Sequence, residues 1–249
     1  MLEPLLPGDE PHLLTEAALT TLLTAARAHG VRVGRISIGA AANDVDIFDA
    51  LRTVFTFPDY CGSGWDSFDD ASDDIAEDTE FPLLMVVDGA FPLLARDPHR
   101  ALHFLLNAAD EARRWTAEGF TWTLAVATER DLEAPRRHLP DAPRPADPSP
   151  WSGLLPRGGE PFMVASAPRI PGALTVDLER IRSAADIDAV IDAIAAAPPA
   201  NGVVVADGLQ RVLRREPALA AQIVLALDVS YRHGFLVLYP GSGNEWTRR

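Results

Sequence analysis

One short stretch of the sequence occurs twice, and this repeat limits the folds available to the chain more than any other feature. Residues 86–98 read VVDGAFPLLARDP, and residues 205–217 read VADGLQRVLRREP. The two stretches align without a gap, with Asp88 opposite Asp207, so the offset from 88 to 207 is 119 residues. Repetition of this kind indicates that one small structural unit is built twice along the chain.

A looser match lies upstream of each stretch. Asp46 aligns with Asp186, and the offset here is 140 residues. Because the offset falls from 140 to 119, the second copy lacks 21 residues between these landmarks. That length is close to the length of residues 58–78 in the first copy. We therefore predict that the second copy keeps the common scaffold and lacks this segment.

Each copy alternates apolar runs typical of buried strands with amphipathic stretches typical of helices. The expected strands span residues 31–38, 82–87 and 120–127 in the first copy and 173–176, 202–206 and 235–239 in the second. The expected helices span residues 15–28, 44–53 and 98–115 in the first copy and 183–197 and 217–233 in the second. This alternation predicts the α/β class, with two small units that each hold a short parallel sheet flanked by helices.

The domain limits follow from the repeat and from a proline-rich region between its copies. We predict a first unit over residues 12–133, which contains an acidic loop and helix, and a second unit over residues 172–249, which lacks them. Residues 134–171 have many prolines and no sustained periodicity, so we expect a linker there.

The overall charge argues against one large class of function. The chain has 36 acidic and 22 basic side chains, for a formal net charge of −14 at pH 7. A nucleic-acid-binding protein needs cations to displace phosphate counterions, so we expect no nucleic-acid partner. The single cysteine, Cys61, excludes a disulfide within the chain and a metal site built from several cysteines.

Targeting signals are not evident in the sequence. Residues 1–14 contain acids and prolines where a signal peptide has a basic flank and an apolar stretch. No apolar run approaches the ~20 residues that span a bilayer. We therefore expect a cytoplasmic location and no membrane association.

The segment missing from the second copy concentrates negative charge. No Lys, Arg or His occurs from residue 53 to residue 95, while nine carboxylates lie between residues 59 and 80. Helical spacing divides the helix expected here into two faces. The inner face holds Trp65, Phe68, Ser72 and Ile75. The acidic face holds Asp66, Asp69, Asp70 and Asp73. Like charges at this spacing weaken a helix, so stability does not explain the arrangement.

Two interpretations of the acidic face are open at this point. It is a solvated surface of an acidic protein, as most charge runs are. Alternatively, it is aimed at a cationic cleft, because a surface of one sign speeds the encounter with an oppositely charged partner. Tyr60, beside the acidic face, has the apolar ring and polar tip typical of an interface anchor.

The stretch from Phe57 to Asp70, FPDYCGSGWDSFDD, resembles the signature of the barstar family, and the resemblance extends over about residues 14–130. Proteins of that family are intracellular inhibitors of barnase-type ribonucleases. The resemblance implies that the loop and helix plug the active site of a ribonuclease. The candidate partner-binding residues are Tyr60, Gly62, Asp66, Asp69, Asp70, Asp73, Asp74 and Glu111.

The resemblance also implies separate roles for four of these residues. Tyr60 would contact the guanine-reading region of the enzyme, and Asp66 would pair with a base in its active site. Asp70 would contribute most to the binding energy, with its carboxylate at the position of the substrate phosphate. Glu111 is the nearest match to a glutamate on the long helix that contributes in the family. The common principle is that a carboxylate imitates a phosphate.

The sequence departs from the family pattern at two positions, and these departures keep alternatives open. Cys61 replaces an aromatic residue, and Gly64 replaces the usual asparagine. The first alternative is a barstar-like module that binds another basic protein without inhibiting it. The second is a magnesium-dependent enzyme that uses the DDxxD pattern at residues 69–73. Enzymes with that pattern are larger and all-helical, so we expect no catalysis, no metal and no cofactor.

Overall fold

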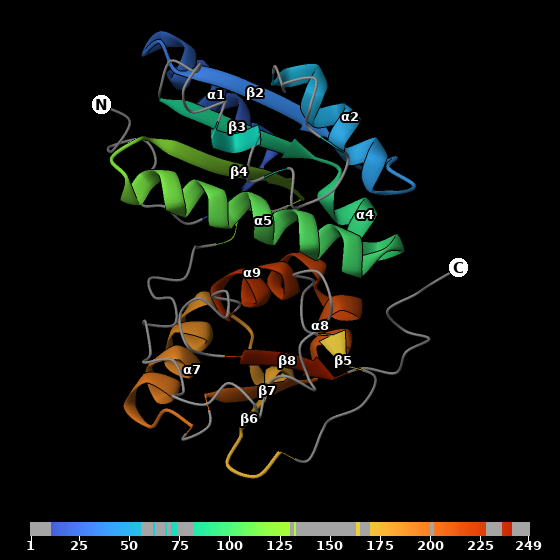
Figure 1. Ribbon diagram of the computed structural model, residues 1–249, viewed down its shortest axis with the longest axis vertical. Helices are drawn as coiled ribbons and strands as arrows, with labels where there is room; N and C mark the ends of the chain where they lie inside the picture. The colour runs from blue at the N-terminus through green and yellow to red at the C-terminus, as the bar shows by residue number, and fades with distance from the viewer. Residues whose placement is uncertain are drawn as a thin grey trace. The chain divides into compact units, whose positions relative to one another are not determined.

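A computed structural model shows two parallel sheets, each with its own helices (Figure 1). The chain divides into two compact units, one made of residues 1–93 and 104–132 and the other of residues 94–103 and 133–249. The structure describes residues 11–55, 62, 68, 71–73, 82–129, 132, 163–164, 170–199, 202–227 and 236–240. Within these ranges, no helix combines the length and the apolar character needed to cross a lipid bilayer.

The first sheet has four parallel strands in the order β1-β4-β3-β2. The strands are β1 (His12–Thr15), β2 (Arg32–Ser37), β3 (Leu83–Asp88) and β4 (Trp122–Thr128). The inner strand β3 is buried from Leu83 to Val87. A parallel strand that is covered on both faces needs apolar side chains at successive positions, which explains its continuous apolar run. The strand expected at residues 82–87 is confirmed.

Helix α1 (Glu16–Ala28) packs against this sheet. Thr15 caps the helix, because its side chain accepts a hydrogen bond from the backbone N–H of Ala18. The apolar residues of the helix and the sheet form one core cluster. It contains Leu19, Leu22, Leu23 and Ala26 of the helix together with Val31, Leu84, Val86 and Ala125.

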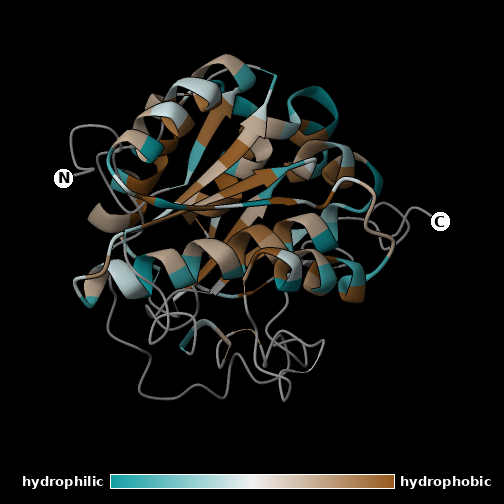
Figure 2. Ribbon diagram, turned by 90° about the horizontal axis from the view of Figure 1, so that it is seen from above, coloured by the Kyte–Doolittle hydropathy of each residue, from teal (hydrophilic) through white to brown (hydrophobic). Residues whose placement is uncertain are grey.

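Helix α2 (Asp44–Val54) lies directly on β2. A Cβ atom at Gly34 would come within 2.6 Å of the Phe55 ring and 2.8 Å of Val54, so glycine permits this close packing. Phe48, a residue of this helix, is fully buried. In Figure 2 the strands are coloured hydrophobic along most of their length, whereas the helices carry both colours, as amphipathic helices on a buried sheet do.

Two helices join β3 to β4. They are α4 (Ala90–Arg96) and α5 (Pro98–Ala117). Helix α5 begins at Pro98. Proline suits the first position of a helix, because a backbone N–H at that position would have no acceptor within the helix. The sequence predicted α5 at residues 98–115 and missed α4, which is only seven residues long. It also missed β1, a strand of four residues.

The second sheet is also parallel, in the order β5-β8-β7-β6. Its strands are β5 (Met163–Val164), β6 (Leu174–Asp177), β7 (Val203–Asp207) and β8 (Leu236–Pro240). Its helices are the short η1 (Leu178–Arg180), α7 (Ala184–Ala196), α8 (Leu209–Arg215) and α9 (Pro217–Leu227). Strand β5 lies within residues 134–171, where we expected a linker. The other predicted domain limits stay predictions.

The two units follow the same plan, in strand order and in local detail. Asn43 caps α2 by accepting a hydrogen bond from the Asp46 N–H, and Ser183 caps α7 by accepting one from the Asp186 N–H. In return, each aspartate carboxylate accepts a backbone N–H that precedes its helix, that of Ala42 at 2.6 Å in α2 and that of Arg182 at 2.8 Å in α7. Matching caps at an offset of 140 bear out the repeated architecture expected from the sequence.

Candidate functional site

The eight predicted site residues fall into two groups. The structure describes Gly62, Asp73 and Glu111. The remaining predicted residues lie outside the described part of the chain; they are Tyr60, Asp66, Asp69, Asp70 and Asp74. The roles assigned to these five residues therefore stay predictions, and the described neighbours supply the local geometry.

The described residues between α2 and β3 show which side of the acidic helix faces inward. Phe68 and residues 71–73 are helical. Phe68 and Ser72 are buried, with exposed fractions of 1% and 0%. The next residue, Asp73, is exposed. For these three residues, burial agrees with the inner and acidic faces that helical spacing predicts.

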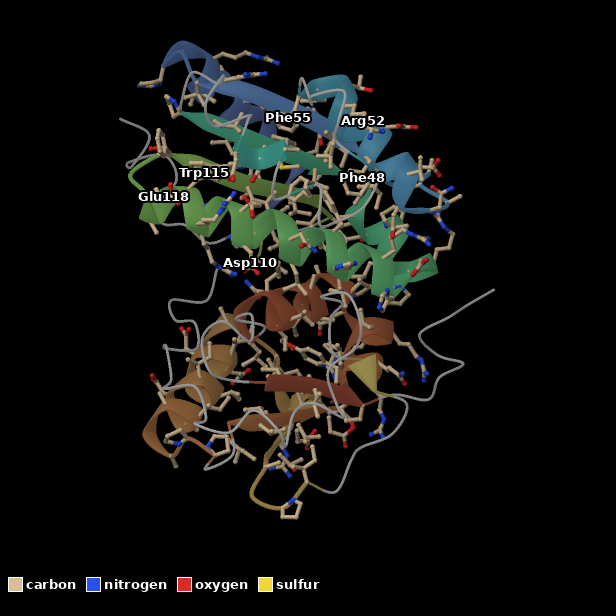
Figure 3. All side chains as sticks on the ribbon, viewed as in Figure 1. Phe48, Arg52, Phe55, Asp110, Trp115 and Glu118 are labelled. Carbon is tan, nitrogen blue, oxygen red and sulfur yellow. The ribbon has the colours of Figure 1, made fainter. Side chains whose placement is uncertain are left out.

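Arg52 contacts this segment at its start. The residue lies on α2 (Figure 3) and its Nη2 donates a hydrogen bond to the Gly62 carbonyl oxygen at 3.0 Å. Its Nη1 donates to Asp49, also on α2, at 3.1 Å. Asp49 and Arg52 are three positions apart on the helix, a spacing at which side chains meet. The guanidinium thus links α2 to the loop that precedes the acidic helix.

A second arginine contacts the segment at its end, from α5. The Nη2 atom of Arg114 donates to the Ser72 hydroxyl at 2.6 Å and lies 2.7 Å from a carboxylate oxygen of Asp73. Its Nε donates to Glu111 at 3.1 Å. The Ser72 hydroxyl in turn donates to the same Glu111 oxygen. These contacts join α5 to two consecutive residues of the acidic helix.

Glu111 is the buried centre of this group. Its exposed fraction is 4%, and its carboxylate accepts hydrogen bonds from Ser72 and Arg114. A buried carboxylate needs such partners, because an unpaired charge away from water is costly. The structure directs the Glu111 carboxylate to groups inside the unit, and the contact with a partner protein that the resemblance implied stays a prediction.

Neighbouring carboxylates and an aromatic ring stabilise the positive charge of Arg114. Partial burial acts to lower the pKa of Arg114, but the carboxylates of Glu111 and Asp73 outweigh this effect and hold that pKa above its ordinary value. The guanidinium carbon also lies 4.8 Å from the centre of the Trp115 ring, within range of a cation–π contact. Trp115 and Asp110 both lie on α5 (Figure 3), and the Trp115 carbonyl oxygen accepts from the backbone N–H of Glu118 at 3.2 Å.

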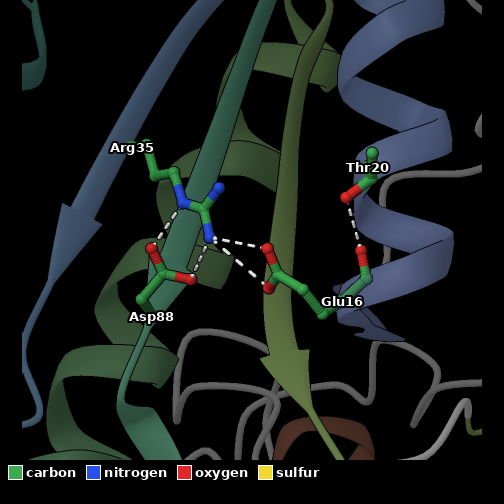
Figure 4. Close-up of polar contacts among 4 residues, drawn as sticks. All are labelled: Glu16, Thr20, Arg35 and Asp88. Atoms are coloured by element: carbon green, nitrogen blue, oxygen red, sulfur yellow. Dashed lines mark hydrogen bonds and ion pairs between the residues drawn. The ribbon is translucent and has the colours of Figure 1, made fainter.

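A separate network lies on the α1 side and contains none of the predicted site residues. Arg35 on β2 donates to both carboxylate oxygens of Asp88, at 2.6 and 3.0 Å, and to Glu16 of α1 at 3.2 Å (Figure 4). The hydrogen bonds that Arg35 donates to Asp88, ahead of those that it donates to Glu16, raise the pKa of Arg35. Thr20 donates to the Glu16 carbonyl oxygen one turn away. This network ties two strands to a helix, which is a structural role.

The sequence reasoning missed Arg52 and Arg114 as parts of the site. Each has an acidic residue three positions earlier on its own helix, namely Asp49 and Glu111, and this spacing does predict an ion pair. The contacts with Gly62 and with residues 72–73 depend on how distant segments pack, and helical spacing carries no signal for them.

Comparison with known proteins finds one family match, and it lies in the first unit. Residues 31–127 match the family described as Barstar (barnase inhibitor). The match spans less than half of the chain, and it includes the acidic segment between α2 and β3 and all of α5. Residues 172–249 lie outside it, so the relation of the second unit to the family stays a prediction. No curated protein matches the chain.

Proposed function

We propose that this chain inhibits a barnase-type ribonuclease by covering the active site of the enzyme with the acidic loop and helix. The observation that carries the proposal is the Barstar family match, which spans this segment and both arginines that contact it. An inhibitor of this kind would act in the cytoplasm, where cellular RNA needs protection from the enzyme.

Electrostatics explains why such a segment suits a ribonuclease. An enzyme that cleaves RNA binds phosphates with cationic side chains, and a carboxylate can occupy the same place through charge-assisted hydrogen bonds. We expect Asp66 and Asp70 to fill this role, because helical spacing assigns them to the face of the exposed Asp73. A surface of one sign also raises the rate of encounter with a basic partner.

The described packing supports a rigid presentation of this face. Phe68 and Ser72 are buried on the inner side, and Arg52 and Arg114 contact the segment from two different helices. A surface that is ordered before binding loses less conformational entropy when the complex forms.

A titration of ribonuclease activity tests the proposal. The full chain is added to a purified barnase-type ribonuclease, and cleavage of a fluorogenic RNA substrate is followed. We expect inhibition at a one-to-one ratio, and we expect Asp70→Ala to weaken it by at least about 30-fold, as loss of a dominant interface residue does. Asp192→Ala, on α7 of the second unit, makes the same charge change and should leave inhibition unchanged.

The outcomes of this titration separate the alternatives. Binding without loss of RNA cleavage would replace the proposal with a non-inhibitory interaction module. If the Asp70 and Asp192 variants weaken inhibition equally, the acidic helix contributes only through the net charge of the protein. Failure to bind any member of a panel of barnase-type ribonucleases would contradict the proposal.

A further inference from the structure

We propose that Arg52 and Arg114 are positioning residues that hold the acidic segment at two places, Gly62 and residues 72–73, and that Glu111 acts by orienting Arg114 and not by touching the partner. We call these three residues, with Ser72, the clamp. The effect of the clamp on partner binding rests on the proposed inhibition of a ribonuclease. The structural part of the proposal, the fixing of Gly62 and of residues 72–73, can be measured in the free protein.

The Arg114 end of the clamp is built around a buried carboxylate. Glu111 accepts from both Nε and Nη2 of Arg114, at 3.1 and 2.5 Å, and Nη2 also lies 2.6 Å from the Ser72 hydroxyl and 2.7 Å from Asp73. A guanidinium is planar and its donors have fixed directions, so fixing one edge of the group fixes the others. Glu111 therefore determines where the Arg114 fork points.

The Arg52 end is simpler and works by the same principle. Asp49 accepts from Nη1 at 3.1 Å, and Nη2 then donates to the Gly62 carbonyl oxygen at 3.0 Å. In both ends, an acid three residues earlier on the helix orients the arginine. The arginine then contacts the segment between α2 and β3.

The composition of the segment explains why it needs outside support. Residues 53–95 contain no basic side chain, so the cations that hold the segment come from outside that range. Aspartates four positions apart repel each other, and aspartate is a poor helix former. A helix with this many aspartates is therefore weakened by its own charges. Arginines from outside the segment offset this loss.

Burial decides between two roles for Glu111. A side chain that contacts a partner directly must offer surface, but Glu111 is only 4% exposed and already bonds to Ser72 and Arg114. Arg114 itself is 29% exposed at its side chain and lies next to Asp73. An indirect role for Glu111, through Arg114, agrees with this geometry.

The kinetics of partner binding distinguish positioning from charge. Removing Arg114 makes the surface more negative, so the charge effect alone leaves association with a basic partner unchanged or faster by up to about twofold. Loss of the clamp leaves the segment to be ordered on binding, so dissociation should accelerate by about tenfold or more. The charge effect therefore leaves the affinity unchanged or raises it, whereas loss of the clamp lowers the affinity.

The experiment combines two measurements on the full chain. Hydrogen exchange is measured in the free protein at the amides of Gly62 and residues 71–73, and association and dissociation rates are measured with a barnase-type ribonuclease on a biosensor. The variants are Arg114→Ala, Glu111→Gln and Ser72→Ala. Arg113→Ala is the matched control, because Arg113 lies on the same helix and pairs with Asp110 of that helix at 3.1 Å.

We expect faster exchange at residues 71–73 and faster dissociation in Arg114→Ala and Glu111→Gln, and no change in Arg113→Ala. Ser72→Ala changes no charge and should show the same effects in weaker form, which keeps the test valid if Arg114→Ala fails to fold. Arg114→Lys should keep the association rate of the unmodified chain but dissociate as fast as Arg114→Ala, because lysine keeps the charge and lacks the fixed fork.

The two measurements keep this proposal separate from the proposed function. If no ribonuclease binds, the inhibitor function fails, while faster exchange in Arg114→Ala alone still supports the clamp. Equal exchange and equal dissociation in Arg114→Ala and Arg113→Ala would overturn the clamp even where inhibition is strong. If Glu111→Gln changes only the association rate and leaves hydrogen exchange unchanged, Glu111 contacts the partner directly and its indirect role is wrong.

Discussion

The two units of the molecule share a strand order, and the connection between α2 and β3 is much longer than its counterpart in the second unit. In the first unit, residues 55–82 join α2 to β3, whereas in the second unit residues 197–202 suffice to join α7 to β7. The second sheet shows that this scaffold forms with a short connection. The long connection of the first unit is therefore not needed to build a parallel sheet of this order.

The polar groups at the ends of the strands differ as well. In the first unit, Arg35 joins Asp88 to Glu16. In the second, Thr175 occupies the strand position that corresponds to Arg35, and Asp177 lies opposite Asp207 in the register of β6 and β7. The shared plan thus tolerates different charges at this edge, while the helix caps are the same in both units.

The largest effect on stability is expected from Phe68→Ala. The ring is 1% exposed, so its removal leaves a cavity and should cost about 3–5 kcal/mol. Urea unfolding of the full chain measures this, with Phe120→Ala, at a side chain that is 39% exposed, as the control. A cost below about 1 kcal/mol would mean that the acidic helix is no part of the first core, and the two units would then differ only by a loose insertion.

The next effect compares the turns after β3 and β7. Gly89 and Gly208 both have positive φ, 75° and 89°, so alanine costs roughly 1–2 kcal/mol at either position. A Cβ atom at Gly89 would also lie 2.5 Å from the backbone nitrogen of Gly39, whereas at Gly208 it would meet the flexible Glu179 side chain at 2.7 Å. We expect Gly89→Ala to destabilise more than Gly208→Ala in thermal unfolding. The reverse order would contradict the different packing of the two turns.

A smaller, equal effect is expected at the two helix caps. Asn43→Ala and Ser183→Ala each remove a side-chain acceptor from the first turn, at a cost of about 1 kcal/mol. Calorimetry of both variants measures the loss. A cost at only one of the two positions would show that the caps, although alike in geometry, do not contribute alike.

The smallest effect concerns acid stability of the second unit. The backbone N–H of Arg182, and then the Ser183 hydroxyl, lower the pKa of Asp186 from its ordinary value. The ionised carboxylate therefore stabilises the fold above the unfolded pKa of about 3.9, and this contribution disappears as the pH falls through the lower folded pKa. Asp186→Asn should flatten this part of the pH dependence of thermal unfolding. An unchanged profile would contradict the assignment.

Much of the fold was predictable because its signals are local. The apolar run at residues 82–87 is long enough to identify a buried strand, and the caps at Asn43 and Ser183 mark helix starts. Strand β5 has two residues, too few for a periodic pattern to emerge, and the four residues of β1 lead directly into α1 with no turn to separate the two elements. Both strands form because neighbouring strands offer hydrogen bonds at the sheet edge, which is a tertiary effect.

The candidate site was predictable only in part, for the same reason. Helical spacing correctly separated the buried Phe68 and Ser72 from the exposed Asp73. It could not show that Glu111 is buried, because that depends on the acidic helix packing over α5. Ser72 and Glu111 are 39 positions apart, and their hydrogen bond exists only in the folded unit.

The most direct test of the account replaces matched pairs of aspartates in the two units. Asp66→Asn with Asp70→Asn changes the acidic helix, and Asp188→Asn with Asp192→Asn changes a pair at the same four-residue spacing on α7. Each double variant is titrated, as the full chain, against a barnase-type ribonuclease. We expect at least about 30-fold weaker inhibition for the first pair and no change for the second. Equal weakening by both pairs, or full inhibition by the first, would contradict the proposed inhibition.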